Sequence, residues 1–253
     1  MKLIFIILLL FGIDGYQANQ NANSKVNKSD SIKKAAIVRR PTLFDRKDPN
    51  SGVGKCYVEK IAEHIANFVE VEPLDTVNQW LLPFAVKFRT DINQIKIRSP
   101  FGASRISHYR GHKHSGADIV PLNMDTGIYI YPVARGIVCY KKIKDPFSSL
   151  IIKHKLSDGS FIFTSYIHLK NIYVENGDTV GTDTKVGKLF THREVRRFRG
   201  PYDHLHFEIR KNFDDFGFGS AYCMNKSELD SFFYEPINFL NEKLKFSQLA
   251  QSH

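Results

Sequence analysis

Polar and apolar residues alternate in the segment Tyr202-Asp203-His204-Leu205-His206-Phe207-Glu208-Ile209. Because successive side chains of a β-strand point to opposite faces, this period predicts a strand whose leucine, phenylalanine and isoleucine line one buried face. His204 and His206 then share the other face. Histidines placed in this way add little to stability, but neutral imidazole binds a metal ion well at neutral pH. The segment therefore predicts both a β-structure and a metal site.

Short β-rich segments recur through the second half of the chain, with turn residues between them. They cover residues 127–132, 136–141, 149–154, 160–168, 171–174 and 204–209. Asp158-Gly159 predicts a hairpin turn, because glycine tolerates the positive φ that tight hairpins require. This regular spacing favours an antiparallel sheet or sandwich over a parallel sheet with crossover helices. We expect a mostly β domain over residues 95–245, ending in a partly helical stretch broken at Pro236.

The first part of the chain divides into three segments by composition. Residues 1–18 combine Lys2 with a short apolar run and small residues near Ala18, which is typical of a signal peptide. An uncleaved N-terminal anchor is the alternative. Residues 19–55 are polar and predict a flexible linker or pro-segment, because they cannot bury enough apolar surface to fold. Residues 56–94 are predicted to be a small helical segment, since apolar residues recur there at helical spacing.

Composition and charge restrict the class of protein. The chain has 253 residues, 42% of them hydrophobic, which suits one ordinary catalytic domain with appended segments. Its net charge of +10 favours contact with anionic surfaces, such as an anionic cell wall. No nucleic-acid partner is expected, because no recognisable binding module is present. No transmembrane segment is expected after the signal peptide.

Three cysteines are too few for a disulfide scaffold, although an oxidising compartment would permit one bridge. Cys139 lies in an apolar run and is predicted to be a buried structural residue. If any pair is bridged, Cys56 with Cys223 is the preferred pair, because the two bracket most of the folded region.

Two further motifs carry residues that can bind a metal ion. In His114-Ser115-Gly116-Ala117-Asp118, a strand or near-strand would direct the histidine and the aspartate to one face. The segment Tyr166-Ile167-His168-Leu169 places a histidine at the end of a strand. Taken singly, the first motif fits a surface turn and the second a partly exposed histidine. Together with the histidine pair they exceed what a structural account requires, and catalytic zinc needs only three such ligands and a position for water.

In order and spacing, the motifs of residues 99–210 resemble those of the lysostaphin-type zinc metalloendopeptidases, which cleave cross-bridge or stem peptides of bacterial peptidoglycan. The matching elements are Phe101-Gly102, His114-x-Gly116-x-Asp118-Ile119, Pro132-Val133-Ala134-x-Gly136-x-Val138, Tyr166-x-His168-Leu169, Val174-x-x-Gly177-Asp178-x-Val180, Gly187 and His204-Leu205-His206-Phe207-Glu208-Ile209-Arg210.

The resemblance implies that His114, Asp118 and His206 bind one zinc ion, while His168 and His204 form a catalytic pair. The pair would orient and deprotonate the attacking water and stabilise the oxyanion. The resemblance also implies a sandwich-like antiparallel β domain with an open groove. The expected enzyme is secreted or periplasmic, acts at the cell envelope and hydrolyses peptidoglycan peptides.

This sequence also departs from the family pattern. Residues 193–203 form a longer, arginine-rich approach to the histidine pair, and its Asp203 is expected either to hold a ligand histidine or to cap a turn. Four further histidines are expected to lie outside the ligand set. They are His108, His112, His154 and His192.

Two other functions remain open from the sequence. One is a catalytically idle relative that binds the cell wall or activates other hydrolases. The other is a basic binding protein in which electrostatics carries the function, which predicts salt-dependent binding to polyanions and no effect of a chelator.

Overall fold

The computed structural model of the protein describes residues 67–106, 111–212, 223 and 225–250. All of these residues belong to one compact unit, whose bounds are Arg39 and His253. The predicted signal peptide, the predicted linker and most of the helix expected between Cys56 and Val69 lie outside the described residues. Cys56 also lies outside them, so its pairing with the buried Cys223 stays a prediction.

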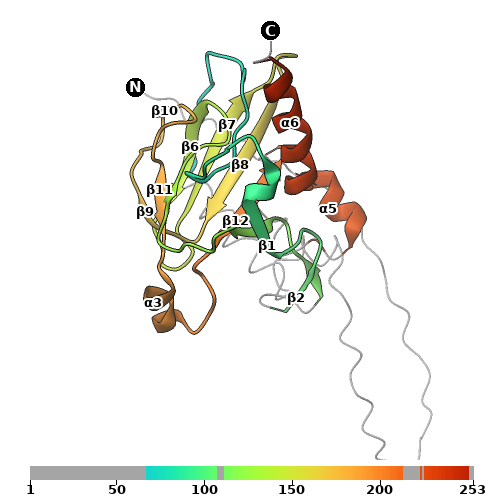
Figure 1. Cartoon of the computed structure of the whole chain (residues 1–253). Coiled ribbons are helices and arrows are strands. Elements are labelled where there is room, and N and C mark those ends of the chain that lie inside the picture. The colour runs from blue at the N-terminus through green and yellow to red at the C-terminus, as the bar shows by residue number, and fades with distance from the viewer. Residues whose placement is uncertain (1–66, 107–110, 213–222, 224, 251–253) are drawn as a thin grey trace, which may run out of the picture. The chain divides into compact units, whose positions relative to one another are not determined.

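A large antiparallel sheet forms the centre of the domain (Figure 1). In spatial order its strands are β1 (Ile95–Ser99), β4 (Ala117–Pro121), β12 (Leu205–Arg210), β8 (Phe161–Ile167), β7 (Ser149–Lys155), β6 (Gly136–Lys142) and β10 (Thr179–Val180), and β13 (Phe233–Tyr234) also pairs with β12. Every pairing between these strands is antiparallel. The predicted mostly β fold is therefore confirmed.

Two smaller sheets and a few helices complete the described structure. The second sheet has the order β5 (Tyr129–Ile130), β11 (Gly187–Leu189) and β9 (Leu169–Ile172), and a two-stranded ribbon pairs β2 (Ser104–Arg105) with β3 (His112–Lys113). The helices are η1 (Ile92–Gln94), α3 (His192–Val195), η2 (Arg196–Phe198), α5 (Lys226–Phe232) and α6 (Pro236–Ala250). In the part of the chain that the structure describes, no helix has the length and apolarity needed to span a bilayer.

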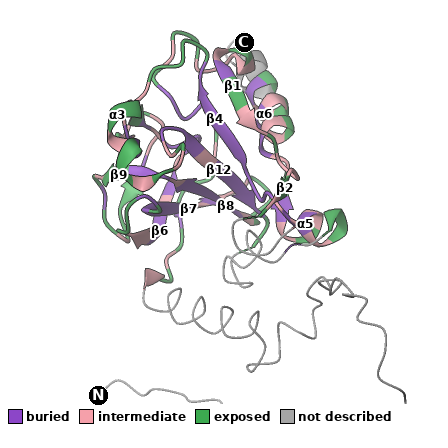
Figure 2. Ribbon diagram, turned by 90° about the horizontal axis from the view of Figure 1, so that it is seen from below, coloured by how far each residue is buried: buried purple, intermediate pink, exposed green. Residues whose placement is uncertain are grey.

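The alternation predicted for residues 204–209 is present in β12. Leu205, Phe207 and Ile209 are fully buried and belong to the main hydrophobic core. His206 and Glu208 alternate with them and therefore face the other side of the sheet. In Figure 2 the strands around β12 are largely buried, whereas α3, α5 and α6 carry exposed residues. The apolar face of β12 thus anchors the strand, and its polar face is left to carry chemistry.

The turn between β7 and β8 confirms the hairpin predicted at Asp158-Gly159. Gly159 has φ +83°, and the Asp158 carboxylate accepts a hydrogen bond from the Ser160 N–H at 2.9 Å. This turn fixes the register of β7 and β8, so it also fixes where β8 ends, immediately before His168.

Residues 70–91 run across the domain in an irregular path rather than as a helix. The Val77 N–H donates to the Lys155 carbonyl at 2.8 Å, and the Leu81 N–H donates to the Val133 carbonyl at 2.7 Å. Trp80, which lies between them, is buried in the main core. The described part of the segment 56–94 therefore packs against the rest of the domain. Within it, helical structure is limited to Asn67 and η1.

Candidate metal centre

The register of three neighbouring strands brings the predicted site residues together. Asp118 of β4 lies directly opposite His206 of β12, and Ile167 of β8 lies opposite His206 on its other side. His168 follows Ile167 at the end of β8, and His204 immediately precedes β12. Residues from three separate parts of the sequence therefore meet at one end of the sheet.

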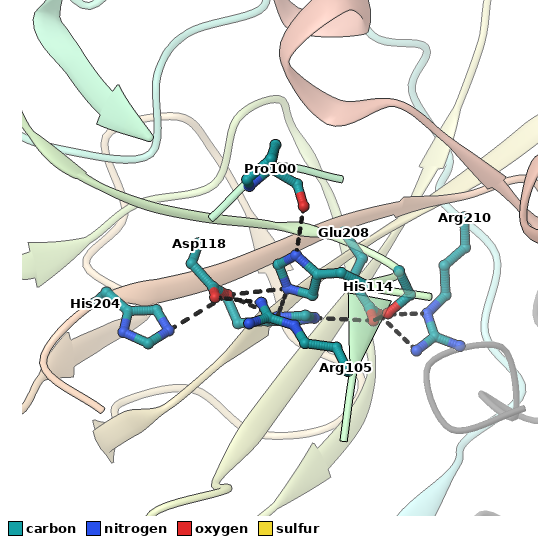
Figure 3. A network of polar contacts seen from close by, with 9 residues as sticks. Pro100, Arg105, His114, Asp118, His204, Glu208 and Arg210 are labelled. Carbon is teal, nitrogen blue, oxygen red and sulfur yellow. Dashed lines mark hydrogen bonds and ion pairs between the residues drawn. The ribbon is translucent and has the colours of Figure 1, made fainter. Parts of the chain in front are cut away.

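His114, Asp118 and His206 form a compact cluster of ligand-type atoms. His114 Nε2 lies 2.9 Å from His206 Nδ1. Asp118 Oδ1 lies 3.1 Å from His114 Nε2 and 3.0 Å from His206 Nδ1. Figure 3 shows the His114, His204 and Arg105 side chains directed at the Asp118 carboxylate. One atom from each of the three residues thus faces a common point.

Hydrogen bonds to the outer ring nitrogens determine which nitrogens face that point. His114 Nδ1 lies 2.8 Å from the Pro100 carbonyl, which can only accept, so this nitrogen donates and Nε2 is left with a lone pair. His206 Nε2 lies 3.1 Å from Glu208 Oε1, and when the ring is neutral, as metal binding requires, the same reasoning leaves Nδ1 with a lone pair. Two imidazole lone pairs and one carboxylate oxygen converge, a donor set that fits a divalent metal ion.

Electrostatics at the cluster also favour a cation. Burial raises the pKa of Asp118, but contact with His114, His204 and His206 outweighs it and holds that pKa well below its usual range. Burial lowers the pKa of His206, but Asp118 and Glu208 outweigh it and raise the pKa to about 9. Because a ligand histidine must be neutral, a metal ion competes there with a proton.

Several residues that support the cluster were not predicted as site residues. The fully buried Glu208 accepts hydrogen bonds from Ser115 Oγ and, at 2.9 Å, from Arg210 Nε. Arg105 NH2 donates to Asp118 Oδ2 at 2.6 Å. Glu208 lies two residues after His206 in an alternating strand, so its position on the same face was predictable, whereas Arg105 and the Pro100 carbonyl gave no sequence signal.

Gly116 explains how the first motif reaches β12. A Cβ atom at this position would lie 2.9 Å from Glu208 Cγ and 3.0 Å from His206 Nε2, and it would also collide with the Phe207 carbonyl. The chain is irregular over residues 114–116, and β4 begins only at Ala117. His114 and Asp118 therefore converge through a close approach of backbone to β12, which only glycine permits, rather than through a continuous strand.

His168 is held at a sharp break in the chain between β8 and β9. It has φ +70°, which is uncommon for a residue with a side chain, and it marks a position where the surroundings fix the backbone. Its Nδ1 donates to the Pro146 carbonyl at 2.8 Å, so Nε2 carries the lone pair. Burial, reinforced by His204 and His206, lowers its pKa to about 3. His168 is therefore neutral at neutral pH.

His204 lies between His168 and Asp118. Its ring centroid is 5.0 Å from that of His168, and its Nε2 is 3.3 Å from Asp118 Oδ1. Its Nδ1 is buried and has no hydrogen-bond partner among the described residues. A buried polar atom without a hydrogen-bond partner is unfavourable, so the described residues leave His204 Nδ1 unsatisfied.

All five predicted residues line one hollow of about 640 Å³. Its other lining residues are Arg105, Ile106, His112, Ser115, Phe147, Ile167, Pro201 and Tyr202. The Tyr202 ring packs 4.9 Å from the His168 ring and 5.3 Å from the Phe147 ring, measured between centroids. The hollow therefore has an aromatic wall beside His168.

The other histidines that the structure describes lie outside the cluster of His114, Asp118 and His206. His154 is fully buried and contacts the Arg135 carbonyl at 2.8 Å and Thr164 Oγ1 at 2.7 Å. His192 lies at the surface and contacts Asp203 at 3.0 Å. His112 lines the hollow but is not part of the cluster, and His108 lies outside the described residues.

Asp203 does not hold a ligand histidine. Its carboxylate accepts from Arg98 at 2.6 Å and contacts the exposed His192. One of the two roles expected for Asp203 is therefore wrong. Its ion pair with Arg98, which lies in β1, instead ties the arginine-rich approach to the edge of the sheet.

The fold and the cluster define an antiparallel β domain with a candidate metal centre in an open hollow. A comparison with protein families finds a match: residues 112–217 match Peptidase family M23. The matched range includes all five predicted site residues. No curated protein sequence matches the chain.

Solved structures also resemble the chain. The antimicrobial peptidase lysostaphin from Staphylococcus simulans is 20% identical, over 60% of this chain and 52% of that chain, with a TM-score of 0.42. A zinc-containing peptidase from Vibrio cholerae is 26% identical, over 53% of this chain and 36% of that chain, with a TM-score of 0.37. A chain of the SpoIIIAH and SpoIIQ complex is 20% identical, over 65% of this chain and 99% of that chain, with a TM-score of 0.37. The chain thus spans about half the length of the full lysostaphin chain.

Proposed function

We propose that this domain is a zinc-dependent endopeptidase that hydrolyses peptide bonds in the cross-bridge or stem peptides of bacterial peptidoglycan. The observation that carries the proposal is the convergence of His114 Nε2, Asp118 Oδ1 and His206 Nδ1 in an open hollow. Three protein ligands of this kind leave one coordination position free, which is typical of catalytic zinc, whereas structural zinc usually recruits cysteine. The substrate class follows from the family resemblance of the motifs.

In this proposal, His114, Asp118 and His206 hold one zinc ion. When bound, zinc lowers the pKa of water and polarises a carbonyl group. The protein's contribution is to fix the ligands. The Pro100 carbonyl orients the His114 ring, and Glu208 orients the His206 ring. Partners of this second layer raise ligand basicity and hold each ring in one tautomer.

His168 and His204 supply the acid–base chemistry. His168 Nε2 carries a lone pair, so in this proposal it accepts a proton from the attacking water. In this proposal His204 acts with His168 to orient the attacking water and to stabilise the negative charge that develops on the carbonyl oxygen. The two rings lie side by side, so both can act on one scissile bond.

The proposed location is the cell envelope or the exterior. It is supported by the pattern of residues 1–18, which is typical of a signal peptide, and by the net charge of +10, which favours contact with an anionic cell wall. A catalytically idle, wall-binding or hydrolase-activating role is the alternative. Relatives of that kind typically lose ligands or catalytic histidines, and this chain retains both.

The test is digestion of purified peptidoglycan by the purified, zinc-loaded protein, with and without a chelator, followed by mass spectrometry of the released fragments. We expect chelator-sensitive release of cross-bridge or stem peptides, and the fragment masses would identify the bond. If a folded protein that contains zinc releases nothing, the idle wall-binding role replaces the enzyme. If binding to the wall depends on salt but not on zinc, the basic binding protein is the better description.

A further inference from the structure

We propose that Arg105 forms a carboxylate-binding subsite beside the metal centre, so that the hollow prefers a peptide with a free carboxylate next to the scissile bond. This inference rests on the proposed function and names its substrate class more closely. It concerns a residue that neither the sequence motifs nor the proposed catalytic steps use.

The position of Arg105 is the first observation. Arg105 lies in β2, opposite His112 of β3, and its side chain reaches the Asp118 carboxylate (Figure 3). NH2 donates to Asp118 Oδ2 at 2.6 Å, while Oδ1 of the same carboxylate faces the histidines. The guanidinium group therefore contacts the Asp118 oxygen that does not face the histidines, and Asp118 alone links it to the candidate metal centre.

The unused hydrogen-bonding capacity of Arg105 is the second observation. A guanidinium group has five N–H donors in a planar fork. Within the described residues, the only partner of the Arg105 side chain is Asp118. The side chain is 30% exposed and lines the hollow, so its remaining donors can be reached from there. A planar fork of donors matches a carboxylate with two parallel hydrogen bonds.

The balance of charge is the third observation. Arg210 pairs with Glu208, and Arg105 pairs with Asp118. Both buried carboxylates are thus already neutralised by an arginine. With a divalent ion bound at His114, Asp118 and His206, these two ion pairs and the ion together carry a net positive charge, so the hollow would attract an anion.

The arrangement of the sheet gives the subsite a direction. The strand order β4-β12-β8 puts Asp118, which Arg105 contacts, on one side of His206, and His168, which packs against Phe147 and Tyr202, on the other. A substrate that reaches from Arg105 to these rings would therefore pass the metal centre.

The test uses two acetylated alanine tripeptides that are identical except that one ends in a free carboxylate and the other in an amide. Binding of each is measured by calorimetry to the zinc-loaded protein, to the chelator-treated protein and to Arg105→Gln and Arg105→Lys. We expect the acid to bind the zinc-loaded protein about tenfold or more tightly than the amide, as charge-assisted hydrogen bonds commonly allow. The preference should disappear in Arg105→Gln and survive in part in Arg105→Lys, which keeps the charge but not the fork.

Zinc content and circular dichroism of each variant separate this role from simple support of Asp118. If Arg105→Gln is folded, holds zinc and still prefers the acid, the metal ion rather than Arg105 recognises the carboxylate, and the inference is overturned. If Arg105→Gln loses zinc, it is compared with the chelator-treated parent protein, which also lacks zinc. The subsite is supported if the parent prefers the acid and the variant does not. It is overturned if the two proteins show the same preference.

Hydrolysis of the same peptides distinguishes failure of the subsite from failure of the proposed function. Equal cleavage and equal binding of acid and amide would leave the peptidase intact and remove the subsite. A preference for the acid in binding, with no cleavage of peptides or peptidoglycan by the zinc-loaded protein, would keep the subsite and remove the peptidase.

Discussion

His154 and His206 are both buried histidines on strands of the same sheet, but their surroundings differ in kind. The ring nitrogens of His154 contact a backbone carbonyl and the hydroxyl of Thr164, both uncharged. Those of His206 face Asp118 and Glu208, both carboxylates. As a result, burial lowers the pKa of His154 to about 4, whereas the two carboxylates outweigh burial at His206 and raise its pKa to about 9.

The contrast between His154 and His206 shows that burial alone does not identify a functional histidine. Both side chains are removed from water, but His154 satisfies its hydrogen bonds within the core and needs no charge. His206 instead lies between two carboxylates and beside a second imidazole, a donor set that fits a metal ion. The distinguishing property is therefore the charge and direction of the partners. Substitution of one residue at a time in the two environments tests this contrast.

The largest expected effect follows removal of a ligand from the cluster. His206→Ala should lose both bound zinc and peptidoglycan hydrolysis, because two ligands hold the ion poorly. The loss should exceed the roughly 10–100-fold cost of losing an outer partner of a ligand. Zinc content by elemental analysis and fragment release by mass spectrometry measure the two effects. His154→Gln is the matched control, and it should retain zinc. Equal zinc loss in both variants would remove the distinction between the two environments.

A smaller effect, confined to turnover, is expected next to the cluster. His204→Ala should keep zinc and lose about 10²- to 10⁴-fold in hydrolysis, the usual contribution of a general acid–base group. The reason is that His204 contacts Asp118 only at 3.3 Å and belongs to the pair with His168 rather than to the ligand set. Full activity of this variant would show that its assigned role is wrong, and loss of zinc would move His204 into the ligand set.

The Glu208→Gln variant tests how strongly zinc binding depends on a charged residue that hydrogen-bonds a ligand histidine. Glu208→Gln keeps the shape of the side chain but removes the charge that Arg210 and His206 face. We expect zinc affinity to fall about 10–100-fold, as measured by competition with a chromophoric chelator. Glu175→Gln, an exposed carboxylate paired with Lys141, serves as the control and should leave zinc affinity unchanged. An unchanged affinity in Glu208→Gln would mean that the Pro100 and Asp118 contacts suffice.

The sequence predicted much of this site because its ligands follow local rules. The alternation in β12 and the spacing of the histidine motifs identified five residues that the structure brings together. Contacts made through the backbone left no such signal. The Pro100 carbonyl that orients His114 belongs to a different segment, and any residue in its place would present the same group.

Long-range pairings explain most of what could not be predicted. Arg105 reaches Asp118 only because the β2–β3 ribbon lies beside the hollow, and the placement of that ribbon follows from tertiary packing. The path of residues 70–91 is similar. Contact with the core determines the positions of the buried Trp80 and Leu82, so the sequence of this segment follows neither helical nor strand periodicity.

The smallest expected effect on function, and the most specific to His154, is a change in how stability depends on pH. The pKa of His154 is lowered from its usual value of 6.5 to about 4 by burial. Between these two pH values the unfolded chain binds a proton that the folded chain does not, so the free energy of unfolding falls as the pH falls. The contribution is fully present above pH 6.5 and lost as the pH approaches 4. A shift of this size corresponds to a loss on the order of 3 kcal/mol.

His154→Gln cannot take up a proton, so it should be less stable at neutral pH because of its altered core, but it should lose less stability on acidification than the parent chain. Urea unfolding of chelator-treated protein at pH 7 and pH 4.5 measures the difference and avoids any contribution from zinc release. His168, whose pKa is also lowered, acts equally in both proteins and cancels in the comparison. Identical pH dependence in the two proteins would mean that His154 remains protonated in the folded state, in which case its surroundings would resemble those of His206 more closely than its uncharged partners imply.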